Sequence, residues 1–252
     1  MATSIKVHLG ARSYDIQIGK GLLDNVGREC RRLSLGNHGF LITDSNVGPA
    51  YADRVRDVMQ ESDIGLNSVV VSAGEESKSR DCLFDLYDAA LESGLDRKSF
   101  VIALGGGVIG DLAGYFAATY LRGIPWVQIP TSLMAMVDSS VGGKTGINLP
   151  QGKNLVGAFY QPAGVFTDTD VLTTLPGREY LSGLAEVAKY GIIHDRGFFS
   201  ELQEHVRDLL EGEGEYLEKV VAKCCSIKAG VVSSDERDRG MRTILNFGHT
   251  LG

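Results

Sequence analysis

A glycine-rich stretch in the middle of the chain carries two lysines beside several amide and carboxylate side chains. It comprises residues 138–154, DSSVGGKTGINLPQGKN, and contains Lys144, Lys153, Asp138 and Asn154. A glycine-rich backbone lets a small molecule approach closely, and ammonium groups neutralise an anion. Either lysine alone would more often be a solvated loop residue. Together they indicate a non-helical loop that binds an anionic small molecule.

A second glycine-rich turn lies upstream, between an apolar run at residues 100–104 and an apolar segment of helical length. Its glycines Gly105, Gly107 and Gly110 match GxGxxG, which favours pyrophosphate binding at a helix N-terminus but also suits a ligand-free turn. The usual acid at the end of the next strand is missing, whereas Asp44 ends an earlier strand. We therefore expect a nucleotide cleft assembled from several strand ends.

Two helical segments near the C-terminus carry further reactive side chains. Glu186, Lys189 and Tyr190 share one helix face, and Asn246 and His249 are spaced i, i+3. Charges on an amphipathic helix are commonly solvated, and a lone histidine is more often structural. A converging carboxylate and imidazole would nevertheless supply two of the three protein ligands of an open catalytic zinc site.

The elements that must position these residues follow from periodicity. An alternating N-terminal segment predicts a hairpin, and strands then alternate with helices up to about residue 167, which predicts a parallel, doubly wound sheet. After Pro176 the pattern becomes helical. The predicted fold is α/β, with a Rossmann-like parallel-sheet domain at residues 1–176 and an all-α domain at residues 177–252.

The composition excludes several classes of protein. With 43% hydrophobic and 23% charged residues, the 252-residue chain reads as a globular protein. Its net charge of −7 argues against a nucleic-acid partner. The N-terminus has no continuous apolar run, and the four cysteines are scattered, so we expect a cytoplasmic protein with free thiols and no membrane partner.

Five separated motifs, spread over the chain from about residue 44 onward, resemble the 3-dehydroquinate synthase family of the shikimate pathway. They are GGGVIGDLAGYFAATYLRGI, IPTSLMAMVDSSVGGKTGIN, GKNLVGAFYQP, LPGREYLSGLAEVAKYGIIHD and ILNFGHTLG. The resemblance implies a lyase that converts 3-deoxy-D-arabino-heptulosonate 7-phosphate to 3-dehydroquinate and phosphate. NAD would be used transiently, followed by phosphate elimination, reduction and intramolecular aldol closure.

The resemblance also implies which residues contact NAD. They lie at the predicted carboxyl ends of strands and in the two glycine-rich stretches: Asp44, Asn46, Glu75, Lys78, Gly106, Gly107, Val108, Ile109, Gly110, Asp111, Thr131, Ser132, Lys144 and Lys153.

A sugar acid phosphate would be bound by residues that match the family's cationic and amide positions: Arg122, Lys144, Lys153, Asn154, Lys189, Lys228, Arg242 and Asn246. Asp138 matches a polar position near the nicotinamide and the substrate.

Glu186 and His249 match two ligands of the family's metal ion, which would be zinc or cobalt. The third ligand belongs to a histidine further along in the family, and the sequence ends at Gly252 inside the GHTxGH motif. We therefore expect a C-terminally truncated chain with an incomplete helical domain. The resemblance also implies a homodimer.

Three alternatives stay open at this point. The chain could be another sugar phosphate cyclase that makes a valiolone or a deoxyinosose. It could be a metal-dependent polyol dehydrogenase of the same fold, which would release NADH. It could also be a non-catalytic, nucleotide-binding remnant that binds zinc weakly or not at all.

Overall fold

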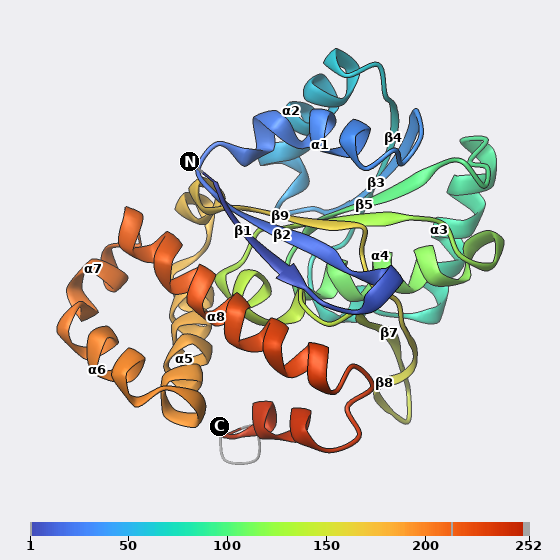
Figure 1. Ribbon diagram of the computed structural model, residues 1–252. Helices are drawn as coiled ribbons and strands as arrows, with labels where there is room; N and C mark the ends of the chain where they lie inside the picture. Colours follow the sequence, from blue (N-terminus) through green and yellow to red (C-terminus); the bar gives the residue numbers. More distant parts are fainter. Residues whose placement is uncertain (1, 213, 249–252) are drawn as a thin grey trace.

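The computed structural model describes residues 2–212 and 214–248 and contains a seven-stranded sheet in the order β1-β2-β9-β6-β5-β3-β4 (Figure 1). Neighbouring strands are parallel except the antiparallel pair β1–β2. The strands are β1 (Thr3–Val7), β2 (Tyr14–Gly19), β3 (His38–Asp44), β4 (Gly65–Val71), β5 (Phe100–Gly105), β6 (Trp126–Pro130) and β9 (Gly164–Asp168). The α-helices among them are α1 (Val26–Arg32), α2 (Gly48–Glu61), α3 (Arg80–Glu92) and α4 (Gly107–Thr119).

Helices cover both faces of this sheet because its central strands are apolar on both sides. Along β5, Phe100, Ile102 and Leu104 belong to the core that contains residues of α1 and α2. Val101 and Ala103 point to the other face, where α3 and α4 pack. The predicted parallel, doubly wound sheet and its N-terminal hairpin are confirmed, and the apolar run predicted at residues 100–104 forms β5.

The stretch predicted as a glycine-rich loop is instead a two-stranded antiparallel ribbon, so that prediction is wrong. Its strands are β7 (Lys144–Leu149) and β8 (Gly152–Phe159). Glycine weakens a strand in isolation, but here it permits close packing: a Cβ on Gly157 of β8 would lie 2.1 Å from the Thr145 carbonyl oxygen. On the facing helix, a Cβ on Gly114 of α4 would lie 2.4 Å from the Thr145 side chain. The ribbon therefore lies directly against α4.

Every element described after β9 is helical. After a 3-10 segment, α5 (Gly177–His194), α6 (Arg196–Glu204), α7 (Val206–Glu211) and α8 (Glu215–Ser234) follow, and then the 3-10 helix η7 (Met241–Asn246). None of the helices in the described ranges has the length and apolar content needed to cross a membrane.

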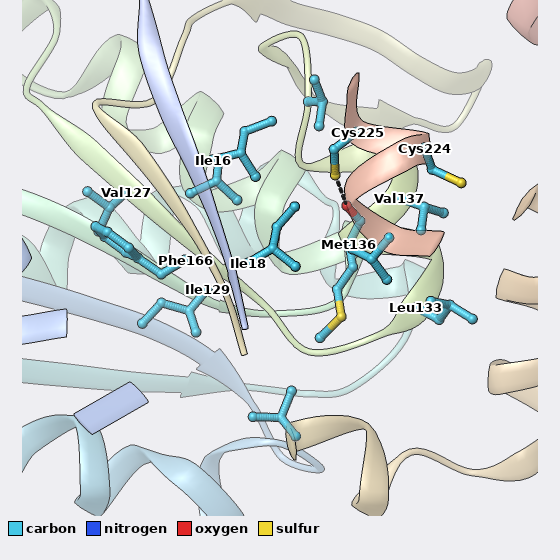
Figure 2. Packing of buried hydrophobic residues seen from close by; sticks show 14 of the residues in the cluster. Ile16, Ile18, Val127, Ile129, Leu133, Met136, Val137, Phe166, Cys224 and Cys225 are labelled. Carbon is cyan, nitrogen blue, oxygen red and sulfur yellow. Dashed lines mark hydrogen bonds between the residues drawn. The ribbon is translucent and has the colours of Figure 1, made fainter. Parts of the chain in front are cut away.

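The helical part shares one apolar core with the sheet. Figure 2 shows Cys224 and Cys225 of α8 beside Met136 and Val137, with Ile18 of β2 nearby, and all five belong to the same cluster. The Cys225 thiol donates a hydrogen bond to the Met136 carbonyl at 3.2 Å. All four cysteines are free, as expected.

Candidate active site

A cavity of about 570 Å³ lies where α4, the ribbon β7–β8, α8 and η7 meet. Six of the predicted cofactor and substrate residues line it: Asp111, Asp138, Lys144, Asn154, Lys228 and Arg242. They come from six separate elements and span more than half of the chain. The fold thus gathers three cations, two carboxylates and an amide around one space.

Lys228 and Asp138 form a buried ion pair at the base of this cavity. The Lys228 Nζ lies 2.6 Å from the Asp138 Oδ1 and also donates to the Asp138 main-chain carbonyl at 2.6 Å. The Tyr190 hydroxyl donates to the same carboxylate at 3.1 Å. Burial alone would raise the pKa of Asp138, but Lys228, together with Lys189 and the Tyr190 hydrogen bond, outweighs burial and lowers the pKa to about 2. Asp138 therefore stays ionised, and its geometry is fixed from two sides.

Arg242 reaches the cavity from η7, beneath the turn that precedes β7. Its Nη1 donates to the carbonyls of Gly142, at 3.3 Å, and Glu236, at 2.9 Å. Gly142 has a φ of +102°, and a Cβ there would lie 2.2 Å from the Arg242 Nη2. Burial lowers the pKa of Arg242 from its high ordinary value, but a guanidinium keeps its proton at neutral pH. The cavity thus contains a permanent, planar cation.

The predicted cofactor residues lie at the carboxyl edge of the sheet. Asp44 ends β3, and its Oδ1 accepts the Asn46 N–H at 2.8 Å. At the end of β5 the Thr131 N–H donates to the Gly105 carbonyl at 3.0 Å, which places Thr131 and Ser132 beside the glycine turn. A Cβ on Gly107 would lie 2.9 Å from the Ser139 Oγ. The turn is therefore bare backbone at the start of α4, which suits close approach of a pyrophosphate.

A polar network connects this edge to the ribbon. Lys78 is 4% exposed, and its Nζ lies 2.6 Å from both the Asp111 Oδ2 and the Asn154 Oδ1. Asn148 accepts the Asn154 N–H and donates to Glu75, each at 2.8 Å. Burial raises the pKa of Asp111 although Lys78 opposes the shift. A second cavity of about 460 Å³, lined by Glu75 and Lys78 among others, lies next to this network.

Glu186 has a burial and a charge environment that suit a metal ligand. Its carboxylate is 6% exposed, contacts the Lys189 ammonium on the same helix face, and has a pKa raised by burial and by the charge of Asp138. A buried carboxylate of this kind is stabilised by a further cation. Within residues 2–212 and 214–248, no group of three or more histidine, cysteine or acidic side chains could hold a metal ion. His249, the other predicted ligand, lies outside the described residues.

Other predicted substrate residues do not line the cavity. Arg122 is exposed in the 3-10 turn after α4, and Asn246 is exposed on η7. Lys153 is exposed too, with its Nζ 4.0 Å from Glu75. Lys189 is buried behind the cavity, where it contacts the Leu245 carbonyl. The structure thus brings together Lys228 of α8, Lys144 of β7 and Arg242, and these four residues are not part of the cavity lining.

Three residues that the sequence did not single out support the site. Tyr14 of the N-terminal hairpin hydrogen bonds to Gly142, Glu236 accepts from Arg12, and Asp238 contacts Lys144. The signal for Tyr14 was a polar-tipped residue on the buried face of a strand. The acidic run that contains Glu236 and Asp238 has no local pattern that would distinguish it from a solvated surface loop.

Comparisons with known proteins agree with this geometry. A solved 2-deoxy-scyllo-inosose synthase, complexed with carbaglucose-6-phosphate, NAD⁺ and Co²⁺, is 28% identical with a TM-score of 0.90, over 98% of this chain and 67% of that one. A 2-epi-5-epi-valiolone synthase from Streptomyces hygroscopicus subsp. jinggangensis 5008, with NAD⁺ and Zn²⁺ bound, is 28% identical with a TM-score of 0.85, over 94% of this chain and 66% of that one. Fold and site thus define a member of the sugar phosphate cyclase superfamily.

The family within that superfamily follows from the sequence comparisons. Profiles for the N-terminal and C-terminal parts of 3-dehydroquinate synthase match residues 68–182 and 183–252. The 3-dehydroquinate synthase of Geobacter metallireducens is 51% identical over 249 residues, which cover 99% of this chain and 69% of that protein. This chain belongs to the 3-dehydroquinate synthase family. Its function is that of the family, a carbon–oxygen lyase activity of the shikimate pathway.

Proposed function

We propose that the 570 Å³ cavity is where 3-deoxy-D-arabino-heptulosonate 7-phosphate binds and is converted to 3-dehydroquinate and phosphate. The observation that supports this most strongly is the convergence of Lys144, Lys228 and Arg242 beside Asp138 and Asn154 in one space. The substrate carries a carboxylate and a phosphate, and cations at several points of a cavity bind and orient such a molecule. Neither a simple polyol nor a neutral sugar would need three cations.

The chain's own residues then act by positioning and charge. Arg242 and Lys144 neutralise the anionic groups, and Asn154 donates or accepts a hydrogen bond at the ribbon wall. The ion pair of Asp138 with Lys228 provides fixed charges next to the sugar hydroxyls. Lys189 and Asn246 are proposed as substrate contacts from the helical part, with Lys153 at the ribbon tip. No role is assigned to Arg122.

NAD is the proposed cofactor, bound along the carboxyl edge of the sheet. The bare turn at Gly106 and Gly107 would take the pyrophosphate, and Asp44, Glu75 and Lys78 would hold other parts of the molecule. Zinc or cobalt is the proposed metal ion, with Glu186 and His249 as two of its ligands. When bound, NAD accepts and returns a hydride while the metal ion lowers the pKa of the hydroxyl that is oxidised.

The remaining proposals concern organisation. We propose a boundary at residue 176 between an NAD-binding domain and a helical metal and substrate domain. We also propose a homodimer located in the cytoplasm.

Turnover by the protein expressed from its complete reading frame tests the proposed function. With NAD and Zn²⁺ or Co²⁺, it should release phosphate from the heptulosonate phosphate and form 3-dehydroquinate, without accumulation of NADH. Faster turnover of sedoheptulose 7-phosphate would favour another cyclase. Steady growth of NADH absorbance with a simple alcohol would favour a polyol dehydrogenase.

A further inference from the structure

Tyr14 is a buried residue of the N-terminal hairpin that reaches the wall of the active site. Its side chain is 3% exposed and lies on the same face of β2 as Ile16 and Ile18. Its hydroxyl oxygen accepts a hydrogen bond from the Gly142 N–H at 3.1 Å, across 128 positions of sequence. A buried N–H that loses its partner is costly, so this bond fixes the orientation of the peptide before Gly142.

Gly142 in turn contacts Arg242 on its other side. Its carbonyl accepts from the Arg242 Nη1 at 3.3 Å, and its α-carbon is so close to the guanidinium that a Cβ would lie 2.2 Å from Nη2. One residue therefore stands between the Tyr14 hydroxyl and a cation that lines the cavity.

The hairpin also contacts Glu236, the second residue whose carbonyl accepts from Arg242. Arg12, in the turn between β1 and β2, donates two hydrogen bonds to the Glu236 carboxylate, at 2.5 and 2.7 Å. The main-chain carbonyl of Glu236 is the second acceptor of the Arg242 Nη1, at 2.9 Å. The two residues whose carbonyls accept from Nη1 are thus each hydrogen-bonded, through another of their groups, to a residue from the first 14 positions of the chain.

We propose that Tyr14 is a positioning residue for Arg242, with the Arg12–Glu236 pair as a second brace. The Tyr14 hydroxyl fixes the peptide before Gly142, and the Gly142 carbonyl on the other side of the same α-carbon sets the direction in which the guanidinium meets the substrate's anionic group. The proposal rests on the proposed function for the statement that Arg242 contacts the substrate. The N-terminal hairpin is accordingly part of the active-site framework, although it contributes no residue to the cavity lining.

Tyr14→Phe, which removes only the hydroxyl, tests this in the protein expressed from its complete reading frame. A misdirected guanidinium loses binding energy in the ground and transition states alike, so KM for the heptulosonate phosphate should rise about fivefold to tenfold while kcat stays within about twofold. When Arg242→Lys is already present, Tyr14→Phe should raise KM by less than about twofold, because contacts that act through one residue are not additive.

Tyr180→Phe is the matched control. Tyr180 is also buried, and its hydroxyl donates to the Leu209 carbonyl at 2.7 Å, outside the cavity lining. It should lower the Tm without changing KM. A KM unchanged by Tyr14→Phe, or an equal rise in KM with Arg242→Lys present, would overturn the proposal.

Two further measurements keep the test decisive. If Tyr14→Phe does not fold, Glu236→Gln replaces it: KM should rise about twofold to threefold, again only with Arg242 present, and an unchanged KM overturns the proposal. Amide exchange of residues 141–145 should accelerate in Tyr14→Phe but not in Tyr180→Phe, whether or not the protein turns over substrate. A wild-type protein that makes no 3-dehydroquinate contradicts the proposed function alone.

Discussion

Two lysine–aspartate pairs border the same cavity but differ in their surroundings. Lys228 and Asp138 are 6% and 27% exposed, and Tyr190 donates a third hydrogen bond to the carboxylate. Lys144, on the ribbon, is 50% exposed and contacts Asp238 of the loop after α8. In the first pair the lysine is desolvated and a third donor fixes the carboxylate. In the second pair Asp238 is 18% exposed but the lysine is hydrated, so Lys144 can exchange Asp238 for a substrate anion. The cavity therefore has a fixed wall and an adaptable one.

The largest expected effect comes from breaking the fixed wall with Lys228→Met. The change leaves the partly buried Asp138 carboxylate without its ammonium partner, so the free energy of unfolding should fall by about 3 kcal/mol and kcat/KM by about 10²-fold or more. Chemical denaturation and steady-state kinetics measure both. The control is Lys223→Met. Lys223 lies on the same helix as Lys228 and forms a more exposed ion pair with Asp195, so its loss should lower the free energy of unfolding by less than about 1 kcal/mol. Equal losses of stability and of kcat/KM in Lys228→Met and Lys223→Met would show that the Lys228–Asp138 pair is no more important than an exposed ion pair.

Gly142→Ala should have the next largest effect, because it acts on the fixed wall through the backbone. A methyl group at φ +102° is strained and would push against the Arg242 guanidinium. KM should rise roughly tenfold or more, the equivalent of about 1.4 kcal/mol of lost binding. Gly230→Ala, in open space on α8, provides the comparison and should leave KM unchanged. Wild-type KM in Gly142→Ala would show that Arg242 does not depend on this contact.

Lys144→Gln should separate binding from stability on the adaptable wall. Because the Lys144–Asp238 pair is exposed on the lysine side, the free energy of unfolding should change by less than about 1 kcal/mol. Loss of one cation should still raise KM about tenfold. Thermal unfolding measures the change in stability, and initial rates on the same preparation measure the change in KM. A large loss of stability would place this pair in the same category as Lys228 and Asp138.

The smallest expected effect is that of Asp238→Asn. Asp238 competes with the substrate's anion for Lys144, so its neutralisation should lower KM by up to about threefold at low ionic strength, and the gain should shrink as salt is added. The residue has a φ of +53°, which asparagine tolerates well. Initial rates at low and high salt measure this. A rise in KM would mean that Asp238 holds Lys144 in place.

Much of the fold could be predicted from the sequence because apolar periodicity is local. The alternating strands and helices up to β9 and the change to helices after Pro176 follow from it. The ribbon β7–β8 could not be predicted, since glycine and polar residues at 144–159 mask strand character that comes from packing against α4. The composition changes near residue 176, yet the apolar core continues across that position.

Part of the site could also be predicted, because motifs, like apolar periodicity, are local patterns in the sequence. The motifs identified Asp138, Lys144 and Asn154, and the resemblance added Lys228 and Arg242; the structure places all five around one cavity. The motifs could not reveal hydrogen bonds to the site from residues far away in the sequence. Tyr14 and Gly142 are 128 positions apart, and Arg12 and Glu236 are 224 apart, so no local spacing links them.

The apolar cluster that joins Cys225, Val137 and Ile18 has a consequence for engineering. A chimaera that takes the helices after Pro176 from another cyclase would place foreign side chains in an apolar core that these helices share with the sheet. Differences in side-chain volume within such a core destabilise the fold. Chimaeras of this superfamily should therefore exchange β2 and residues 133–141 together with α8.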